Sequence, residues 1–281
     1  MDLGVPQLPD ILRDNTDRNR TSPFAFTGNK FEFRMPGSRQ NLADPNVVLN
    51  TAVAEQCDRF VEYVAARSDE PFAVVALRFV RHTFRDHQRI IFNGNGYSDE
   101  WEEEAKRRGL PNLKATPDAL PALLDPSNIA LFEKYGVLTG AEMHARYVAK
   151  AEQYAKLLNI EANCMVDMAR RLYVPAISSY AGDLATAVAA KADLGISSPA
   201  EKGIVTKLTR GIDAIWELAE DLETRNSKAR GIEDPGEQDQ FYFDEVLPAM
   251  QRLRDEVDAL EPIVGDSWWP VPTYNTILYY V

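Results

Sequence analysis

The sequence has few cysteines and no long hydrophobic run, and each absence excludes a class of protein. Its 281 residues include two cysteines, Cys57 and Cys164, which lie far apart. Two distant cysteines form neither a disulfide framework nor the paired spacing of a structural zinc site, which favours a reducing compartment. No segment approaches the roughly 20 apolar residues needed to span a bilayer, and the amino terminus lacks the basic start and apolar stretch of a signal peptide. We therefore expect a soluble, cytoplasmic protein with no membrane partner.

Basic charge is also scarce. Lysine and arginine total 31 against 43 aspartates and glutamates, which gives a formal net charge of -12. Contact with nucleic acid needs clustered basic residues to neutralise phosphates, so this composition excludes nucleic acid as an expected partner. Hydrophobic residues make up 45% of the chain and aromatic residues 10%, which is enough for the core of one large domain or two smaller ones.

Two short aromatic runs near the amino terminus predict a β-hairpin. Gly28 and Asn29 separate the run 22–27 from the run 30–35, which is a typical hairpin signal. The second run alternates strictly, so its apolar and charged side chains lie on opposite faces of the strand. The apolar face consists of Phe31, Phe33 and Met35. The charged face consists of Lys30, Glu32 and Arg34.

The charged face of this strand has two interpretations. Side chains two residues apart on a strand lie about 6 to 7 Å apart, which suits a polyanion held through a metal and fixed cations. The alternative is the solvated face of an ordinary antiparallel strand, which alternation alone favours. Arg20, shortly before the hairpin, adds a guanidinium suited to forked recognition of carboxylate or phosphate. Its alternative is an ordinary arginine in a surface loop.

Helices are expected after the hairpin. The first is predicted at 46–67, with Asp44 as the N-cap and Pro45 at the first helical position. A second is predicted at 71–89 and a charged third at 97–109. These three segments are short or of medium length.

Longer helices are expected in the second half of the chain. One is predicted at 139–191 with an interruption near Pro175, and another at 199–230. The polar connector 231–239 contains Asp-Pro-Gly, so the last two helices are expected to form an antiparallel hairpin. The aromatic tail from Trp268 is expected to dock onto this region. The last helix carries apolar residues in steps of four and three, a heptad seam, formed by Val246, Met250, Leu253, Val257, Leu260 and Val264.

Other residues with chemical potential have structural explanations. His82 and His87 lie five apart on an expected helix, which does not match the i, i+4 spacing of a metal-binding pair. We expect packing or surface roles for them and for His144. The loop 93–96, Asn-Gly-Asn-Gly, lacks the Lys-Ser/Thr of a phosphate-binding loop and predicts a turn.

Three segments resemble a known family. Residues 17–34 read Asp-Arg-Asn-Arg-Thr-Ser-Pro-Phe-Ala-Phe-Thr-Gly-Asn-Lys-Phe-Glu-Phe-Arg. They resemble the Asn-Arg-Ser/Thr segment and the Arg/Lys-x-Glu-x-Arg strand of glutamine synthetases, with wording nearest to the type III class. Residues 43–50 resemble the family's Asp-Pro-x-x-Asn-Pro-Tyr-Leu helix start, and residues 113–155 resemble its closing helical segment. The sequence is identified as the C-terminal portion of a type III glutamine synthetase.

This resemblance implies roles for four residues. Arg20 would contact the nucleotide phosphates and the transferred phosphoryl group. Glu32 would ligate a catalytic Mg²⁺ or Mn²⁺ ion, and Arg34 would hold the substrate glutamate and the reaction intermediate. Lys30 stands where many members place a nucleotide-side arginine. The implied reaction uses ATP to phosphorylate the side-chain carboxylate of glutamate, and ammonia then attacks the γ-glutamyl phosphate, in an enzyme that forms a homo-oligomeric ring.

The resemblance also implies an α+β fold. Residues 1–112 would form the terminal part of the catalytic β-barrel or sheet, as a β-hairpin with helices. Residues 113–281 would form a long-helix bundle with an antiparallel helical hairpin and a docked aromatic tail. The stretch 23–26 lacks the arginine that many members carry there. The family's other metal-binding glutamates, its metal-binding histidine and its N-terminal β-grasp domain are absent, so activity of the chain alone is not expected. The alternative is a non-catalytic helical assembly protein, derived from a glutamine synthetase, in which residues 139–264 bind partner chains.

Overall fold

The computed structural model describes residues 24–26, 30–34, 37, 40–92, 96 and 98–279. Backbone contacts divide the chain into two compact units. Unit 1 comprises residues 1–114 and 125–140, and unit 2 comprises residues 115–124 and 141–281. The boundary expected at residue 112 concerns a catalytic domain and stays a prediction. Among the described residues, no helix has the length and apolar character needed to cross a membrane.

Unit 1 holds a small β-hairpin and a group of helices. Its elements are β1 (Phe24–Phe26), β2 (Phe31–Phe33), α1 (Ala43–Ala65), α2 (Phe72–Asp86), the 3-10 turn η2 (Gln88–Ile90), α3 (Asp99–Arg107) and α5 (Pro126–Lys134). Within the described residues, the two strands pair only with each other. The catalytic barrel implied by the resemblance is therefore not shown, because strands of three residues with one neighbour each cannot close a barrel.

The helix α1 begins earlier than the sequence predicted. It starts at Ala43, and Leu42 occupies the N-cap position. The prediction of Asp44 as N-cap is therefore wrong, since Asp44 lies inside the first turn. The side chain of Asn41 accepts a hydrogen bond from the backbone N–H of Ala43 at 2.7 Å, which satisfies one donor of the first turn. Pro45 is tolerated there because first-turn N–H groups have no partner within the helix.

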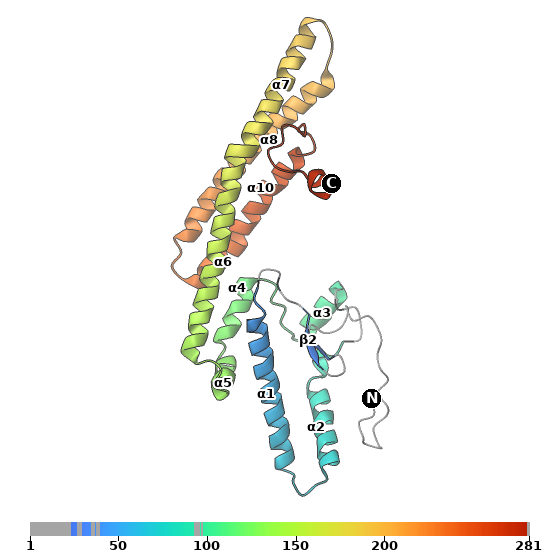
Figure 1. The fold of residues 1–281 in the computed structure, drawn as a ribbon, viewed down its shortest axis with the longest axis vertical. Coiled ribbons are helices and arrows are strands. Elements are labelled where there is room, and N and C mark those ends of the chain that lie inside the picture. Colours follow the sequence, from blue (N-terminus) through green and yellow to red (C-terminus); the bar gives the residue numbers. More distant parts are fainter. Residues whose placement is uncertain are drawn as a thin grey trace. The chain divides into compact units, whose positions relative to one another are not determined.

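Aromatic side chains join α1 to α2, which lie side by side in unit 1 (Figure 1). The ring of Phe60 on α1 meets Phe79 on α2 edge to face, with centroids 5.1 Å apart. Tyr63 meets the same Phe79 at 5.3 Å. Val75 of α2 is fully buried. Edge-to-face rings add to the free energy of burial, so this pair of helices packs through one face of α2.

The helix α5 is fastened to α1 by polar contacts. Lys134 donates to Glu55 Oε2 at 2.6 Å. The hydroxyl of Tyr135 lies 3.0 Å from the same Glu55 oxygen and 2.6 Å from Asp58 Oδ2. Hydrogen bonds from Lys134, Arg59 and Tyr135, in that order of effect, lower the pKa of Glu55 to about 2. The carboxylate is therefore ionised at neutral pH and holds the end of α5 on α1.

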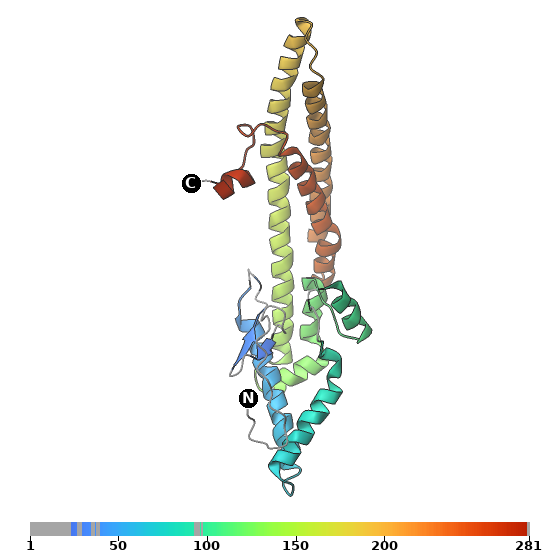
Figure 2. The ribbon, with the colours of Figure 1, turned by 90° about the vertical axis from the view of Figure 1, so that its right-hand side faces the viewer.

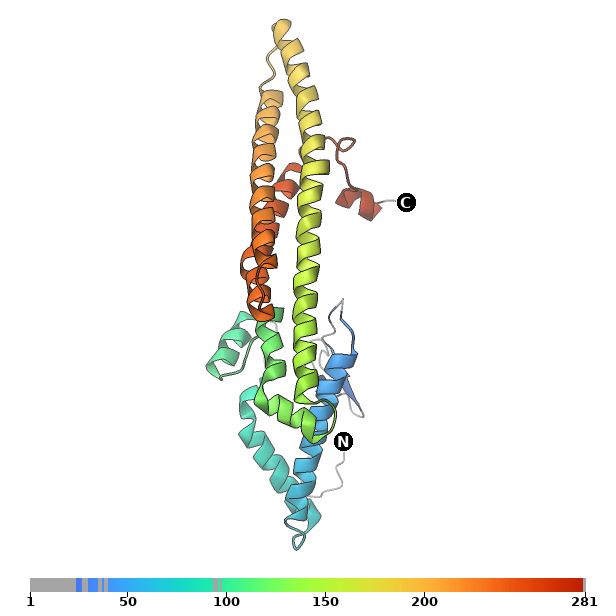
Figure 3. The same cartoon turned by 90° about the vertical axis from the view of Figure 1, so that its left-hand side faces the viewer.

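Unit 2 is built from long helices. Its elements are α4 (Thr116–Ala119), η3 (Leu120–Leu124), α6 (Gly140–Met168, whose first residue belongs to unit 1), η4 (Ala169–Tyr173), α7 (Val174–Asp193), α8 (Pro199–Arg230), α9 (Pro235–Phe241), η5 (Tyr242–Val246), α10 (Leu247–Leu260) and α11 (Tyr274–Tyr279). The bounds of α8 match the predicted helix at 199–230. The helical run α6–α7 continues through its expected interruption, as Figures 2 and 3 show in green and yellow.

Two π-helical turns occur in unit 2, and both end two residues before a proline. The turn η4 ends at Tyr173, before Pro175, and the turn η5 ends at Val246, before Pro248. Proline has no N–H to donate, and its ring clashes with the carbonyl four residues earlier in an α-helix. A wider turn at that point relieves the clash without ending the helix. This explains why Pro175 interrupts the regular α-helical pattern but not the helical run.

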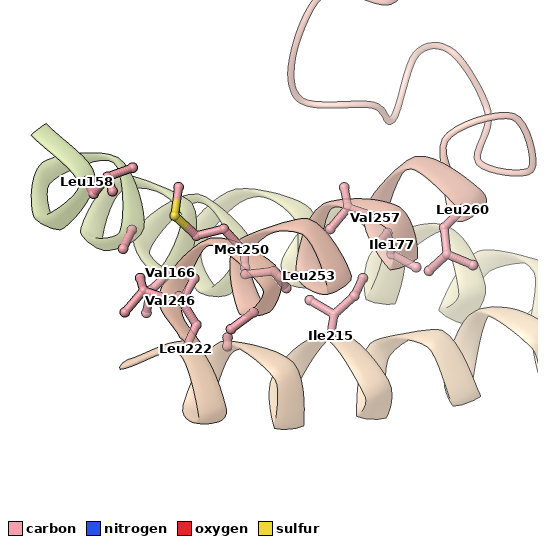
Figure 4. Packing of buried hydrophobic residues seen from close by; sticks show 14 of the residues in the cluster. Leu158, Val166, Ile177, Ile215, Leu222, Val246, Met250, Leu253, Val257 and Leu260 are labelled. Atoms are coloured by element: carbon pink, nitrogen blue, oxygen red, sulfur yellow. The ribbon is translucent and has the colours of Figure 1, made fainter. Parts of the chain in front are cut away.

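The heptad seam is confirmed as the centre of the unit 2 core. Each of its six residues is buried, and Figure 4 shows side chains of α10 interleaved with those of α8 and of α6–α7. From α8 the largest fully buried contributors are Leu208, Ile215 and Leu222. Burial of one such side chain stabilises by roughly 1.5 to 3 kcal/mol. The contact between α8 and α10 agrees with the predicted pairing of the last two helices. The predicted connector 231–239 is too long, because α9 already begins at Pro235 with Asp234 as its N-cap and continues through η5 into α10.

A polar cluster lies inside this apolar core. Asn226 of α8 is buried, and its amide nitrogen donates to Asn159 and Asn163 of α6 at 3.0 Å each. The hydroxyl of Tyr242 donates to the Asn226 carbonyl oxygen at 3.2 Å. Buried amides must be paired, because an unpaired one costs on the order of 1 to 3 kcal/mol. Sliding α8 along α6 would break these pairs, so the cluster fixes the register of the helices.

The aromatic tail packs against the bundle. Trp269 is buried, and its ring lies 5.1 Å from that of Tyr173 in η4. Trp268 is more exposed and lies 6.3 Å from Tyr180 of α7. These contacts hold residues 268–269 against the helical run α6–α7.

A pair of glycines in α8 gives the first test of this core. A Cβ atom on Gly211 would lie 2.5 Å from Cδ1 of the buried Leu260, whereas a Cβ atom on Gly203 meets no atom within 4 Å. Gly211→Ala is expected to lower the free energy of unfolding by about 1 to 2 kcal/mol, because overpacking outweighs the gain in helix propensity. Gly203→Ala is expected to raise it by up to about 1 kcal/mol. Urea unfolding measures both, and equal effects at the two positions would contradict the close approach of α8 to α10.

Candidate functional site

The predicted charged face exists on the β-hairpin. Strands β1 and β2 are antiparallel, with Phe24 opposite Phe33 and Phe26 opposite Phe31. The rings of Phe24 and Phe31 stack with centroids 4.8 Å apart, which places the aromatic side chains together. Alternation along the strand therefore directs the charged side chains to the opposite face. Met35 and the turn residues lie outside the described residues.

Three predicted site residues come together on this face. The guanidinium of Arg34 donates two hydrogen bonds to Glu32 Oε2, from Nη2 at 3.1 Å and from Nε at 3.3 Å. The ammonium of Lys30 lies 3.5 Å from the other carboxylate oxygen, Oε1. The side chain of Arg34 is 20% exposed and that of Lys30 is 66% exposed. The arginine is thus held in place by its fork of hydrogen bonds, while the lysine remains accessible.

These cations fix the charge of the central carboxylate. The hydrogen bond from Arg34, and to a smaller extent the contact with Lys30, lower the pKa of Glu32 below its usual range. Partial burial opposes this shift but does not cancel it. Glu32 is therefore ionised at neutral pH, which is the form that accepts hydrogen bonds or ligates a metal.

A divalent metal needs more than this face supplies. Mg²⁺ takes near-octahedral oxygen coordination, and Mn²⁺ favours similar ligands. Glu32 offers the right ligand type, but its Oε2 already accepts both hydrogen bonds from Arg34. Across the part of the chain that the structure describes, no three histidine, cysteine, aspartate or glutamate side chains are grouped to hold an ion. The described residues therefore do not make a metal site by themselves.

The fourth predicted site residue, Arg20, lies outside the described residues. Its proposed role in phosphate binding stays a prediction. Most of the predicted turn 93–96 also lies outside them.

Two of the three histidines have packing partners, and His87 is exposed. His82 meets Tyr63 edge to face at 6.3 Å, and the ring of His144 lies 6.3 Å from that of Tyr147. These contacts agree with the predicted packing roles. Cys57 and Cys164 are free and exposed.

An arginine clamp beside the turn 93–96 had no signal in the sequence. Arg108, at the end of α3, donates to the carbonyl oxygens of Ile91 at 2.7 Å and Arg89 at 3.2 Å. The rings of Phe92 and Trp101 stack with centroids 4.3 Å apart. The segment before the turn and the helix after it are thereby joined. These partners lie 17 and 19 residues from Arg108, beyond the reach of local sequence patterns.

Hollows of ligand size beside α10 and the tail do not have linings suited to an anion. One of about 420 Å³ carries the acids Asp258, Glu261 and Asp266, and its neighbour is mainly apolar. A cavity of about 400 Å³ lies between α6, α10 and the tail. Its apolar walls include Met165, Met168, Leu253 and Val257. The cation at its edge, Arg254, is paired with Asp258 at 3.2 Å. A phosphate would meet no cluster of cations here, so the hairpin face remains the candidate site for anion chemistry.

A buried carboxyl group in unit 2 was also missed by sequence reasoning. Asp239 of α9 is 1% exposed, and its Oδ1 has no hydrogen-bond partner. Burial raises the pKa of Asp239 to about 7. The titratable neighbours Tyr147 and Tyr154 of α6 have pKa values raised by their own burial, Tyr154 to about 12. Asp239 ends the segment 231–239, which the sequence predicts as a polar connector, and acidic residues in such a segment are ordinarily exposed to solvent.

The pH dependence of stability tests this assignment. A carboxyl group whose folded pKa lies above its unfolded value near 3.8 binds more protons in the folded state between about pH 4 and 7. Stability from this group is therefore present at low pH and lost as the pH rises through 7. When the pH is raised from 4 to 8, the free energy of unfolding of Asp239→Asn is expected to rise by on the order of 2 to 4 kcal/mol relative to that of the wild type. Thermal or urea unfolding at the two pH values measures this difference. Asp213→Asn, which alters an exposed aspartate, serves as the control and should show no such rise. An equal change in the free energy of unfolding for the two variants would contradict a buried Asp239 with a raised pKa.

Comparison with known proteins identifies the relatives of this chain. Residues 75–192 match the glutamine synthetase C-terminal domain. A type-3 glutamine synthetase of Dictyostelium discoideum is 36% identical over 99% of the chain, and a glutamine synthetase of Butyrivibrio fibrisolvens is 35% identical over 96%. A glutamine synthetase of Bacteroides fragilis is 32% identical over 99% of the chain.

The match covers only part of each relative. The chain spans 39% of the length of each of these three proteins. The domain match begins in α2, after the hairpin. The charged hairpin face therefore lies outside the domain match, and its relation to glutamine synthetases rests on the three relatives that match nearly the whole chain.

Proposed function

This chain matches the C-terminal portion of type III glutamine synthetases, and we propose that it supplies one wall of the active site of such an enzyme. The enzyme would join ammonia to L-glutamate at the expense of ATP, through a γ-glutamyl phosphate. The observation that carries the proposal is the cluster of Lys30, Glu32 and Arg34 on one face of β2, in a chain related to glutamine synthetases along nearly its whole length. Residues 1–112 would complete the catalytic domain, and residues 113–281 would form the helical C-terminal domain.

The side chains of the face suit the proposed roles. Arg34 is held in place by its two hydrogen bonds to Glu32, and a guanidinium fixed in this way would bind the carboxylate of glutamate at little entropic cost. Lys30 is accessible and would lie toward the nucleotide. Arg20 would stabilise the charge on the transferring phosphoryl group, since arginine acts there by electrostatics without forming a covalent bond.

Glu32 would contribute one oxygen to a site for Mg²⁺ or Mn²⁺. The ion, when bound, offsets the negative charge between ATP phosphates and the glutamate carboxylate. The remaining ligands must come from chain outside the described residues, because one carboxylate does not fill the coordination shell. We propose that a complete enzyme also requires the remaining part of the glutamine synthetase chain, assembled as a homo-oligomeric ring.

The non-catalytic alternative loses part of its support. Its sequence argument was the heptad seam as a surface for partner chains. The seam residues are buried within unit 2, so this seam stabilises the chain's own bundle.

The chain alone is expected to be inactive. With ATP, Mg²⁺, glutamate and ammonia, the purified 281-residue chain should form no glutamine at steady state, because the described residues supply a single metal-ligand carboxylate. Phosphate release and glutamine formation measure this. Steady glutamine formation by the isolated chain that disappears in Glu32→Ala would contradict the expectation.

Activity is expected when the rest of the enzyme is present. The partner for this test is the part of the Butyrivibrio fibrisolvens relative that precedes the matching region, co-expressed with this chain. In that assembly Glu32→Gln and Arg34→Lys should each lower kcat/KM by about 100-fold or more, through loss of a metal ligand and of the guanidinium fork. Lys156→Gln, which alters an exposed lysine paired with Glu152 on α6, serves as the control. Equal activity of Glu32→Gln and the control would refute the proposed site.

A further inference from the structure

Helix α2 is apolar on two opposite sides. Phe79 contacts Phe60 and Tyr63 of α1, and Val75, one turn before Phe79, is fully buried. Successive residues of an α-helix are rotated by about 100°, so Phe84 lies about 180° around the helix from Val75, and Val80 lies about 40° from Phe84. A helix that is apolar on both sides is ordinarily packed between two layers of structure.

The second apolar side is open to solvent. Phe84 is 62% exposed and Val80 is 46% exposed. On the helical projection Ala73 falls between them, and the half-buried Leu77 lies about 20° beyond Phe84. The outward face of α2 is therefore defined by Ala73, Leu77, Val80 and Phe84. The spacing of three and four residues makes a continuous stripe along the helix. Stripes of this kind mark contact surfaces when they are exposed.

Unit 1 as a whole has little core of its own. Its buried hydrophobic residues, among those described, are Val75, Ala105 and Phe132. Large side chains exposed in the same unit are more numerous and include Val47, Val48, Val61, Phe72, Val80, Phe84, Ile90 and Ile91. A domain this exposed buries too little apolar surface to offset the conformational entropy lost in folding. Further polypeptide is needed to cover it.

The occupant is indicated by the length of the relatives. The matching C-terminal domain begins within α2, at residue 75. In each of the three relatives this region belongs to a chain in which about three fifths of the residues lie outside the match. We propose that the outward face of α2 docks against this remaining part of the glutamine synthetase polypeptide, in the same chain or as a separate one. This proposal rests on the proposed function.

Charge defines the border of the docking surface. Arg81 lies about 40° beyond Leu77 on one side of the outward face. Arg85, about 40° further round, is paired with Asp86 at 3.1 Å. Arg78, further round the helix, is held by Glu70 through hydrogen bonds at 2.6 and 2.9 Å. With three arginines and the single acid Asp86, α2 is positively charged in a chain of net charge -12. The surface that docks here is therefore apolar with acidic residues along one edge.

Co-expression with the remaining part of the enzyme tests the docking surface. The probe is the segment of the Butyrivibrio fibrisolvens relative that precedes the matching region, with a purification tag on this chain. The wild type should retain the probe through affinity purification and size-exclusion chromatography. The double variant Val80→Glu/Phe84→Glu should retain at least about tenfold less, because two carboxylates would have to be buried without partners. Leu194→Glu, at a position 77% exposed in unit 2, should retain the probe like the wild type.

Other outcomes would overturn the proposal. Failure of the wild type to retain the probe, or equal retention by the double variant, would show that α2 does not dock it. Sedimentation of the isolated chain as a dimer that Val80→Glu/Phe84→Glu converts to a monomer would assign the face to a second copy. Circular dichroism of the purified variants verifies that both substitutions leave the helices intact.

The two proposals fail separately in this experiment. A stable complex that forms no glutamine would support the docking surface and refute the proposed function. Glutamine formation that is unaffected by the double variant would support the function and refute the docking surface.

Discussion

The helical unit depends on the burial of the α10 seam. The six apolar side chains of the seam, four of them on α10, share one side of the helix. Burying them requires α8 and the run α6–α7 to pack against that side (Figure 4). The other features of the unit follow from this packing. The π turns before Pro175 and Pro248 keep the helical runs continuous where proline would otherwise break the contact surface. Asn226 and its partners then select one register from those that the apolar seam alone would tolerate.

Periodic features were predictable from the sequence, whereas features made by distant residues were not. Alternation in β2 placed Lys30, Glu32 and Arg34 on one face, and the limits of α8 follow from Pro199 and Gly231 at its ends. The start of α1 was misplaced because Asp44 and Pro45 form a familiar cap pattern, while Asn41 satisfies the N–H of Ala43 from outside the helix. Nothing local distinguishes the buried Asp239 from the exposed acids around it.

The candidate site also combines features that the strand determines with features that other segments must supply. Strand geometry sets which side chains share a face, and hydrogen bonding then fixes the charge of Glu32 and the orientation of Arg34. Strand geometry cannot supply further oxygen ligands, since those must approach from other segments. The close Arg34–Glu32 pair also means that a metal ion would compete with a guanidinium for the same carboxylate. A second cluster of acidic groups opposite this face would favour the ion in that competition.

The two units differ in how much of their own apolar surface they bury. The unit that carries the candidate site is the one that buries less. Unit 2 closes its own core, so its seam is unavailable for partners. Unit 1 carries the charged hairpin face and leaves one side of α2 uncovered. The docking proposed for α2 would explain both features, because the polypeptide that covers this helix could also bring metal ligands to the hairpin face. If the remaining glutamine synthetase polypeptide packs against α2, the same association that completes the hydrophobic core brings additional chain to unit 1, where Glu32 and Arg34 lie. Folding of unit 1 and assembly of the active site would then be a single coupled step.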